Sequence, residues 1–130
     1  MTAPSEKLKI LYLDDEDINL YIFEEFFKDY FEVVTTTSAE TALTLLGDAS
    51  AGIQVVITDL KMHPVSGMAF VARARDAGFS LPICVLSAFP KTPDIDAAIT
   101  NGQISVFFNK PFDADLILRR IQSLVNGQDN

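Results

Sequence analysis

Five side chains that could do chemistry lie at or just beyond the ends of apolar stretches of the chain. They are two adjacent carboxylates, a single carboxylate, a hydroxyl and an ammonium group: Asp14 and Asp15, Asp59, Ser87, and Lys110. Three carboxylates that converge cannot all stay ionised at low cost, and a hard divalent cation bound through oxygen is the usual answer. Magnesium is the natural candidate, because it prefers one or two carboxylates, several waters and a phosphate oxygen. The set therefore favours phosphoryl chemistry with magnesium.

Asp59 is the better nucleophile of the three carboxylates, because it stands alone at the end of its apolar run, while Asp14 and Asp15 form a pair of ligands. A carboxylate that attacks phosphorus forms an aspartyl phosphate. This transfer needs in-line positioning and neutralisation of charge on the phosphoryl oxygens, which magnesium, Lys110 and Ser87 would supply. Each residue also has an ordinary explanation as a turn, strand-end or solvated residue. That explanation requires several coincidences at once, so we favour the functional interpretation.

Five predicted strands alternate with five predicted helices. The run 53–59 is apolar and β-branched, which is typical of a strand buried on both faces in a parallel sheet. Similar reasoning places the other strands at 8–13, 31–37, 81–86 and 104–109. Short connections and right-handed crossovers then predict an α/β fold, a doubly wound five-stranded parallel sheet with five helices. Among the possible strand orders we expect 2-1-3-4-5.

The helices are predicted from apolar residues at helical spacing and from capping residues before them. The expected N-caps are Asp17, Ser38, Thr92 and Asp113. The first helix is expected to face the core with Ile18, Ile22, Phe23, Phe26, Phe27 and Tyr30. In an open parallel sheet, ligands bind beyond the carboxyl ends of the strands. The predicted strand order therefore brings Asp14 and Asp15 to Asp59, with Ser87 and Lys110 at the same rim.

Composition limits the other functions of the chain. Its 130 residues, 48% of them hydrophobic, fit a single domain over 1–130 with a core at about 7–126. The net charge of −8 argues against direct binding of nucleic acid. No apolar run approaches the roughly 20 residues of a membrane span, and no signal segment is found, so we expect a cytoplasmic protein without membrane contact. Cys84 is expected to be a small buried hydrophobe and His63 a solvated turn residue.

Four segments together resemble the receiver domain of bacterial two-component response regulators, in particular the single receivers of the chemotaxis type. They are Asp14-Asp15, 59–67, 86–88 and 107–112, and the resemblance extends from about Lys7 to Val125. It implies that Asp59 accepts a phosphoryl group from a histidine kinase or a histidine phosphotransfer protein. It also implies that Asp15, Asp59 and the Lys61 carbonyl hold Mg²⁺ with the help of Asp14, and that the Lys110-Pro111 bond is cis.

The resemblance further implies a switch. Ser87 would move toward the phosphoryl group, Phe107 would follow it inward, and the face of the fourth helix, fifth strand and fifth helix would change shape. This change would alter binding of a downstream protein and could support a phosphorylation-dependent homodimer. Such a protein is not an enzyme, apart from catalysing its own phosphorylation and dephosphorylation.

Some positions depart from the family pattern. His63 replaces the usual proline, with Pro64 one place later, and Phe107 replaces a frequent tyrosine. Lys61 and Phe89 occupy positions that flank the phosphoryl group in this fold, and we expect Phe89 to slow hydrolysis. Some phenylalanines of the first helix, Phe23 or Phe27, could dock a kinase domain.

Three other classes of protein share part of this pattern. A phosphatase of the haloacid dehalogenase type needs a second aspartate where this chain has Lys61, and in an FMN binder the acids 14–17 would repel the phosphate. The stronger alternative is a receiver-like interaction module that works without phosphorylation. The sequence leaves open the cognate kinase, the downstream target, the oligomeric state and whether the receiver stands alone or belongs to a larger regulator.

Overall fold

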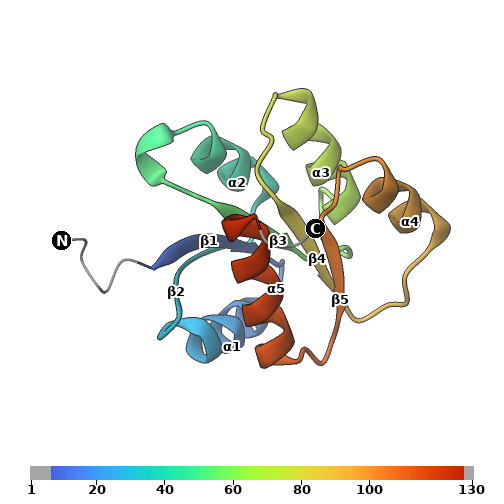
Figure 1. Ribbon diagram of the computed structural model, residues 1–130. Helices are drawn as coiled ribbons and strands as arrows, with labels where there is room; N and C mark the ends of the chain where they lie inside the picture. Colours follow the sequence, from blue (N-terminus) through green and yellow to red (C-terminus); the bar gives the residue numbers. More distant parts are fainter. Residues whose placement is uncertain (1–6, 128–130) are drawn as a thin grey trace.

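A five-stranded parallel sheet forms the centre of the computed structural model, which describes residues 7–127 (Figure 1). The strands are β1 (Leu8–Leu13), β2 (Phe31–Thr36), β3 (Val55–Thr58), β4 (Ile83–Ser87) and β5 (Val106–Asn109). Their order is β2-β1-β3-β4-β5, and every neighbouring pair is parallel. The predicted fold and strand order are confirmed.

Helices cover both faces of the sheet. They are α1 (Asp17–Phe27), α2 (Ala39–Leu46), α3 (Gly67–Asp76), α4 (Pro93–Thr100) and α5 (Ala114–Asn126), with a short 3₁₀ turn, η1 (Ala49–Ala51), after α2. Figure 1 shows α1 and α5 on one face and α2, α3 and α4 on the other. No helix in the described range 7–127 is long and apolar enough to cross a membrane.

Three of the four predicted N-caps are confirmed. The side chains of Ser38, Thr92 and Asp113 each accept a hydrogen bond from a backbone N–H in the first turn of α2, α4 and α5. The prediction of Asp17 as the cap of α1 was wrong. Asp17 is the first helical residue, and the preceding Glu16 has no side-chain cap bond.

Three strands begin two residues later than the sequence pattern indicates. The apolar residues Ile53, Leu81 and Ile104 precede β3, β4 and β5, and they contribute to the hydrophobic cluster under α2, α3 and α4 instead of to the strands. Hydrophobicity therefore marked burial correctly at these positions but not participation in the sheet.

The apolar stripe of α1 was only partly predicted. Leu20, Phe23 and Phe27 are the buried side chains of this helix. The other residues assigned to the core are 40–60% exposed: Ile18, Ile22, Phe26 and Tyr30. Apolar residues occupy more of the circumference of α1 than the sheet can cover, so one side of the stripe faces solvent.

Candidate functional site

The carboxyl ends of β1 and β3 lie side by side. Leu13 is paired with Thr58, and the Asp59 N–H donates to the Leu13 carbonyl at 2.9 Å. The next residues on each strand are therefore neighbours, and carboxylate oxygens of Asp14, Asp15 and Asp59 lie within 4.8 Å of one another. Asp14 and Asp59 are buried and Asp15 is half-buried. The convergence that the sequence predicted is present in the structure.

Lys110 brings a positive charge to this cluster from the end of β5. Its Nζ lies 2.9 Å from Asp14 Oδ2 and 3.6 Å from Asp59 Oδ2. The backbone of Lys110 is held by its N–H, which donates to the Ser87 carbonyl at 2.8 Å, and the Lys110-Pro111 bond is cis. One ammonium group thus contacts two carboxylates from different strands.

Asp14 has a full set of protein partners. Its Oδ2 accepts from the Tyr12 hydroxyl at 2.9 Å and from Lys110, while its Oδ1 accepts from the Glu16 N–H at 3.0 Å and from Asn19 Nδ2 at 3.4 Å. Sequence reasoning missed Tyr12 and Asn19. Strand alternation could have identified Tyr12, because residues two apart on a strand share a face.

Asp59 is a buried carboxylate with an altered pKa. Burial raises its pKa, Lys110 lowers it, and the nearby Asp14 carboxylate raises it, with a net increase above the ordinary value. The backbone N–H groups of Leu60 and Lys61 lower the pKa in part, the former through a 2.7 Å bond to Oδ1. The balance shows that desolvation is the largest influence on this group.

Burial also raises the pKa of Tyr12, and the neighbouring Asp14 carboxylate raises it further. The phenol therefore stays protonated and can act as a hydrogen-bond donor across the ordinary pH range.

Ser87 is fully buried at the end of β4. Its Oγ accepts a hydrogen bond from the Phe89 N–H at 3.0 Å, so the hydroxyl oxygen is engaged with the loop that follows the strand. The Phe89 side chain is 50% exposed, and Lys61 Nζ lies 4.9 Å from the centre of its ring. Lys61 and Phe89 therefore form a cation–π contact between the loop after β3 and the loop after β4.

Gly67 lets the start of α3 approach the end of β3. Its N–H donates to the Leu60 carbonyl at 2.9 Å. A Cβ at this position would overlap the Asp59 carbonyl oxygen and lie 2.9 Å from Leu60 Cα. The sequence alone did not indicate this role of Gly67, because a close approach between two segments leaves no local pattern.

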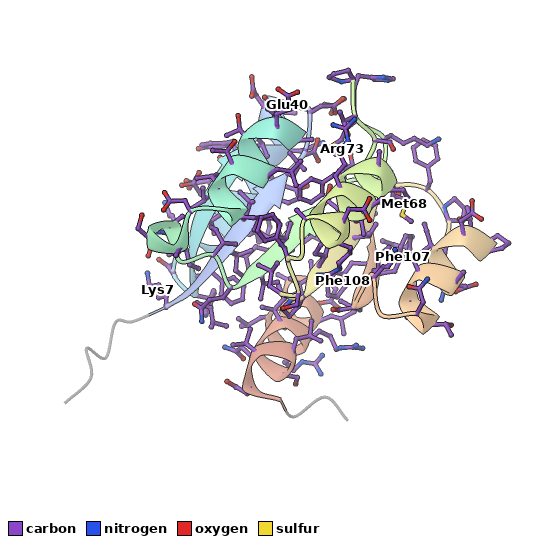
Figure 2. All side chains as sticks on the ribbon, turned by 90° about the horizontal axis from the view of Figure 1, so that it is seen from above. Lys7, Glu40, Met68, Arg73, Phe107 and Phe108 are labelled. Carbon is purple, nitrogen blue, oxygen red and sulfur yellow. The ribbon has the colours of Figure 1, made fainter. Side chains whose placement is uncertain are left out.

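Phe107 is half-buried on β5, where it is paired with Val85. It packs against the cluster beneath α3 and α4, whereas the next residue, Phe108, packs on the side of α1 and α5 (Figure 2).

His63 is exposed and forms a cis bond with Pro64. Cys84 is completely buried, and this burial raises the pKa of its thiol to about 12, so it is the inert apolar residue that we expected.

The donor set suits a magnesium ion. Three carboxylates offer oxygens from one small region, and Asp15 keeps part of its side chain open to water. Magnesium typically retains several waters and uses few protein oxygens, so a cluster at the surface fits it better than an enclosed cage. The single ammonium of Lys110 leaves an excess of negative charge that a divalent cation would neutralise.

Comparison with known proteins identifies the family. A model of the response regulator receiver domain matches residues 10–122. The response regulator SaeR of Staphylococcus epidermidis is 33% identical over 112 residues, which are 85% of this chain and 47% of that protein. The transcriptional regulatory protein GlrR of Escherichia coli is 32% identical over 91 residues, which are 70% of this chain and 20% of that protein. The chain thus spans about half the length of SaeR and about a fifth of the length of GlrR.

Solved structures agree in fold. A response regulator receiver domain from Clostridium thermocellum has a TM-score of 0.82 at 26% identity and covers 93% of this chain and 96% of its own. The receiver domain of the Francisella response regulator 1452 has a TM-score of 0.82 at 20% identity, over 95% of this chain and all of its own. Because the family model matches residues 10–122, most of the chain, this chain belongs to the response regulator receiver domain family.

Proposed function

We propose that the chain is the phosphoryl-accepting switch of a two-component phosphorelay, with Asp59 as the acceptor. The observation that carries this proposal is the position of the Asp59 carboxylate, which is buried next to the Lys110 ammonium and to the carboxylates of Asp14 and Asp15. A single receiver domain would be the working unit, located in the cytoplasm. Receiver domains act as signalling switches and not as enzymes with a separate substrate.

In the proposed reaction, an oxygen of Asp59 attacks the phosphorus of a phosphohistidine as the phosphorus–nitrogen bond breaks. The Lys110 ammonium and the Ser87 hydroxyl donate charge-assisted hydrogen bonds to the phosphoryl oxygens. Asp15, Asp59 and the Lys61 carbonyl, with the help of Asp14, would hold magnesium, which would supply positive charge at the phosphoryl oxygens. The dephosphorylated chain is restored when water attacks the same phosphorus.

The proposed switch begins at Ser87. In the structure its Oγ accepts from the Phe89 N–H, so donation to a phosphoryl oxygen would draw the loop after β4 toward Asp59. Phe107, half-buried on the same side of the sheet, would move into the space that Ser87 leaves. The new hydrogen bonds shift the population toward a state with a different α4, β5 and α5 face. That face would bind the downstream partner or a second receiver.

An exposed apolar surface on α1 fits the phosphodonor protein. It consists of Ile18, Tyr21, Ile22 and Phe26, and we name it the α1 patch. A pocket lined by Ile22, Phe26, Phe112 and Lys110 joins this patch to the acceptor site. A histidine kinase or phosphotransfer protein docked on the α1 patch would bring its phosphohistidine to the side of the site where Lys110 lies.

Intact mass spectrometry tests the proposal directly. The wild type and Asp59→Asn are incubated with magnesium and acetyl phosphate, with and without EDTA. We expect the wild type to gain one phosphoryl group only when magnesium is free, and the variant to gain none. No gain in the wild type, despite magnesium binding, would refute the proposal and favour the alternative of a receiver-like module that works without phosphorylation.

A further inference from the structure

Tyr12 places a polar hydroxyl at a buried position of β1. Tyr12 lies in the otherwise aliphatic second half of β1 and is 1% exposed. Its ring stacks on Phe23, with the ring centres 4.2 Å apart, so packing holds the side chain in one orientation. The hydroxyl then points to the Asp14 carboxylate and donates to Oδ2 at 2.9 Å.

The same carboxylate oxygen also binds Lys110. Lys110 Nζ and the Tyr12 hydroxyl each lie 2.9 Å from Asp14 Oδ2. The other oxygen, Oδ1, has separate donors, namely the Glu16 N–H and Asn19. Tyr12 and Lys110 are therefore the two protein donors that the described structure gives to Oδ2.

Movement of Lys110 would remove one of these donors. In the proposed function, on which this inference rests, the ammonium must turn from Asp14 to the phosphoryl oxygens at Asp59. Asp14 is completely buried, so an oxygen left without a donor there would be costly. A second donor that stays in place lowers this cost.

We propose that Tyr12 is a positioning residue, whose hydroxyl keeps Asp14 Oδ2 hydrogen-bonded and so allows Lys110 to leave it for the phosphoryl group. Tyr12 acts through Asp14 and Lys110 and does not contact the reacting atoms. Removing its hydroxyl leaves Lys110 as the single protein donor to Asp14 Oδ2 in the described structure, which strengthens the hold of this oxygen on the ammonium group. The transfer step then becomes slower, whereas the binding of the phosphodonor is unaffected.

Tyr12→Phe tests the proposal cleanly, because phenylalanine retains the ring that stacks on Phe23 and lacks only the hydroxyl. Tyr30→Phe is the matched control, since Tyr30 is exposed and lies beyond the end of α1. Phosphorylation by acetyl phosphate is followed at saturating magnesium over a range of donor concentrations. We expect the limiting rate constant of Tyr12→Phe to fall about tenfold, equivalent to about 1.4 kcal/mol. The half-saturating donor concentration and the magnesium Kd of Tyr12→Phe should stay within about twofold of the wild-type values.

A double-mutant cycle separates positioning from a general structural effect. In a Lys110→Met background there is no ammonium group to transfer, so the loss of the Tyr12 hydroxyl should change the rate by less than about twofold. A decrease that persists at full size in this background would show that Tyr12 does not act through Lys110 and would overturn the proposal. Equal rates for the wild type and Tyr12→Phe would also overturn it.

A metal-free measurement distinguishes failure of this inference from failure of the proposed function. A wild type that takes up no phosphoryl group refutes the proposed function. The Lys110 ammonium signal in the ¹⁵N spectrum of the metal-free protein then tests the shared carboxylate without any phosphodonor. The signal should shift in Tyr12→Phe and not in Tyr30→Phe, and an unchanged signal in Tyr12→Phe would refute the positioning role.

Discussion

Lys110 forms an ion pair with Asp14, with 2.9 Å between Nζ and Oδ2, although the two residues are 96 positions apart in the chain. The same ammonium lies 3.6 Å from Asp59. One positive charge therefore faces three carboxylates, because Asp15 belongs to the same cluster. The metal-free site has excess negative charge, and this excess determines how the site responds to substitution, pH and metal.

Asp15→Asn should stabilise the metal-free protein. The substitution removes one of three mutually repelling carboxylates, and the repulsion between two charges about 4 Å apart ranges from about 1 kcal/mol in water to about 4 kcal/mol near a protein surface. Magnesium should raise the free energy of unfolding of the wild type and have much less effect on the variant, because a ligand that binds only the folded state stabilises it. Urea unfolding with and without magnesium measures both effects.

Glu24→Gln is the control for this experiment, since Glu24 is an exposed acid of α1 outside the cluster. It should change neither the stability nor the magnesium response. A metal-free Asp15→Asn protein that is less stable than the wild type would contradict the excess of charge.

The stability of the metal-free protein should depend on pH through Asp59. Burial raises the pKa of this carboxyl in the folded state, so protonation favours folding. A group of this kind contributes stability below its unfolded pKa of about 4, and the contribution is lost as the pH rises through the folded value. The free energy of unfolding of the wild type, relative to Asp59→Asn, should therefore decrease as the pH rises from about 4. A difference that stays constant or increases would show that Lys110 outweighs burial.

Phe89→Ala should shorten the lifetime of the phosphorylated protein. The ring of Phe89 contacts Lys61 and so connects the loop after β4 with the loop after β3, where we expect it to obstruct an attacking water. We expect the hydrolysis rate to rise several-fold, measured by loss of the phosphoryl mass after removal of the donor. Tyr21→Ala, which removes an exposed aromatic ring from α1, is the control and should leave the lifetime unchanged. An unchanged or longer lifetime in Phe89→Ala would refute the obstruction.

Gly67→Ala should destabilise the protein by about 1–3 kcal/mol, because the added methyl group would collide with the backbone of Asp59 and Leu60. The collision should also displace the acceptor and slow its phosphorylation. Gly47→Ala is a matched control, since Gly47 has an ordinary helical φ of −78° and its added Cβ would make only normal contacts. Thermal unfolding of both variants makes the comparison, and equal midpoints would argue against close packing at Gly67.

Phe26→Ser and Ile22→Ser should weaken phosphotransfer from the cognate kinase about tenfold or more, while uptake from acetyl phosphate stays near the wild-type rate. Both residues belong to the α1 patch, and loss of a well-packed apolar contact at an interface costs more than about 1 kcal/mol. Phe23 and Phe27 are unsuitable for this test, because they are buried and their substitution would damage the core. Leu116→Ser, an exposed position on α5, is the control, and an equal loss of both activities in Phe26→Ser would contradict the docking role.

The alternation of strands and helices could be predicted from the sequence, and so could the meeting of Asp14, Asp15 and Asp59 at one rim once the strand order 2-1-3-4-5 was chosen. These features follow from local patterns. Apolar runs end at polar residues, and short right-handed crossovers restrict how parallel strands can be arranged. Lys110 was placed at the same rim for the same reason, and Ser87 was expected at the end of its strand.

The buried side of α1, the close approach of α3 to Asp59 and the donors to Asp14 could not be predicted from local patterns. Each depends on the surface that a neighbouring element presents. Phe23 and Phe26 look alike in an apolar stripe, yet the first stacks on Tyr12 and the second stays exposed. The bond from Tyr12 to Asp14 likewise requires Phe23 to hold the ring from another element, so the sequence contains the residues but not the contact.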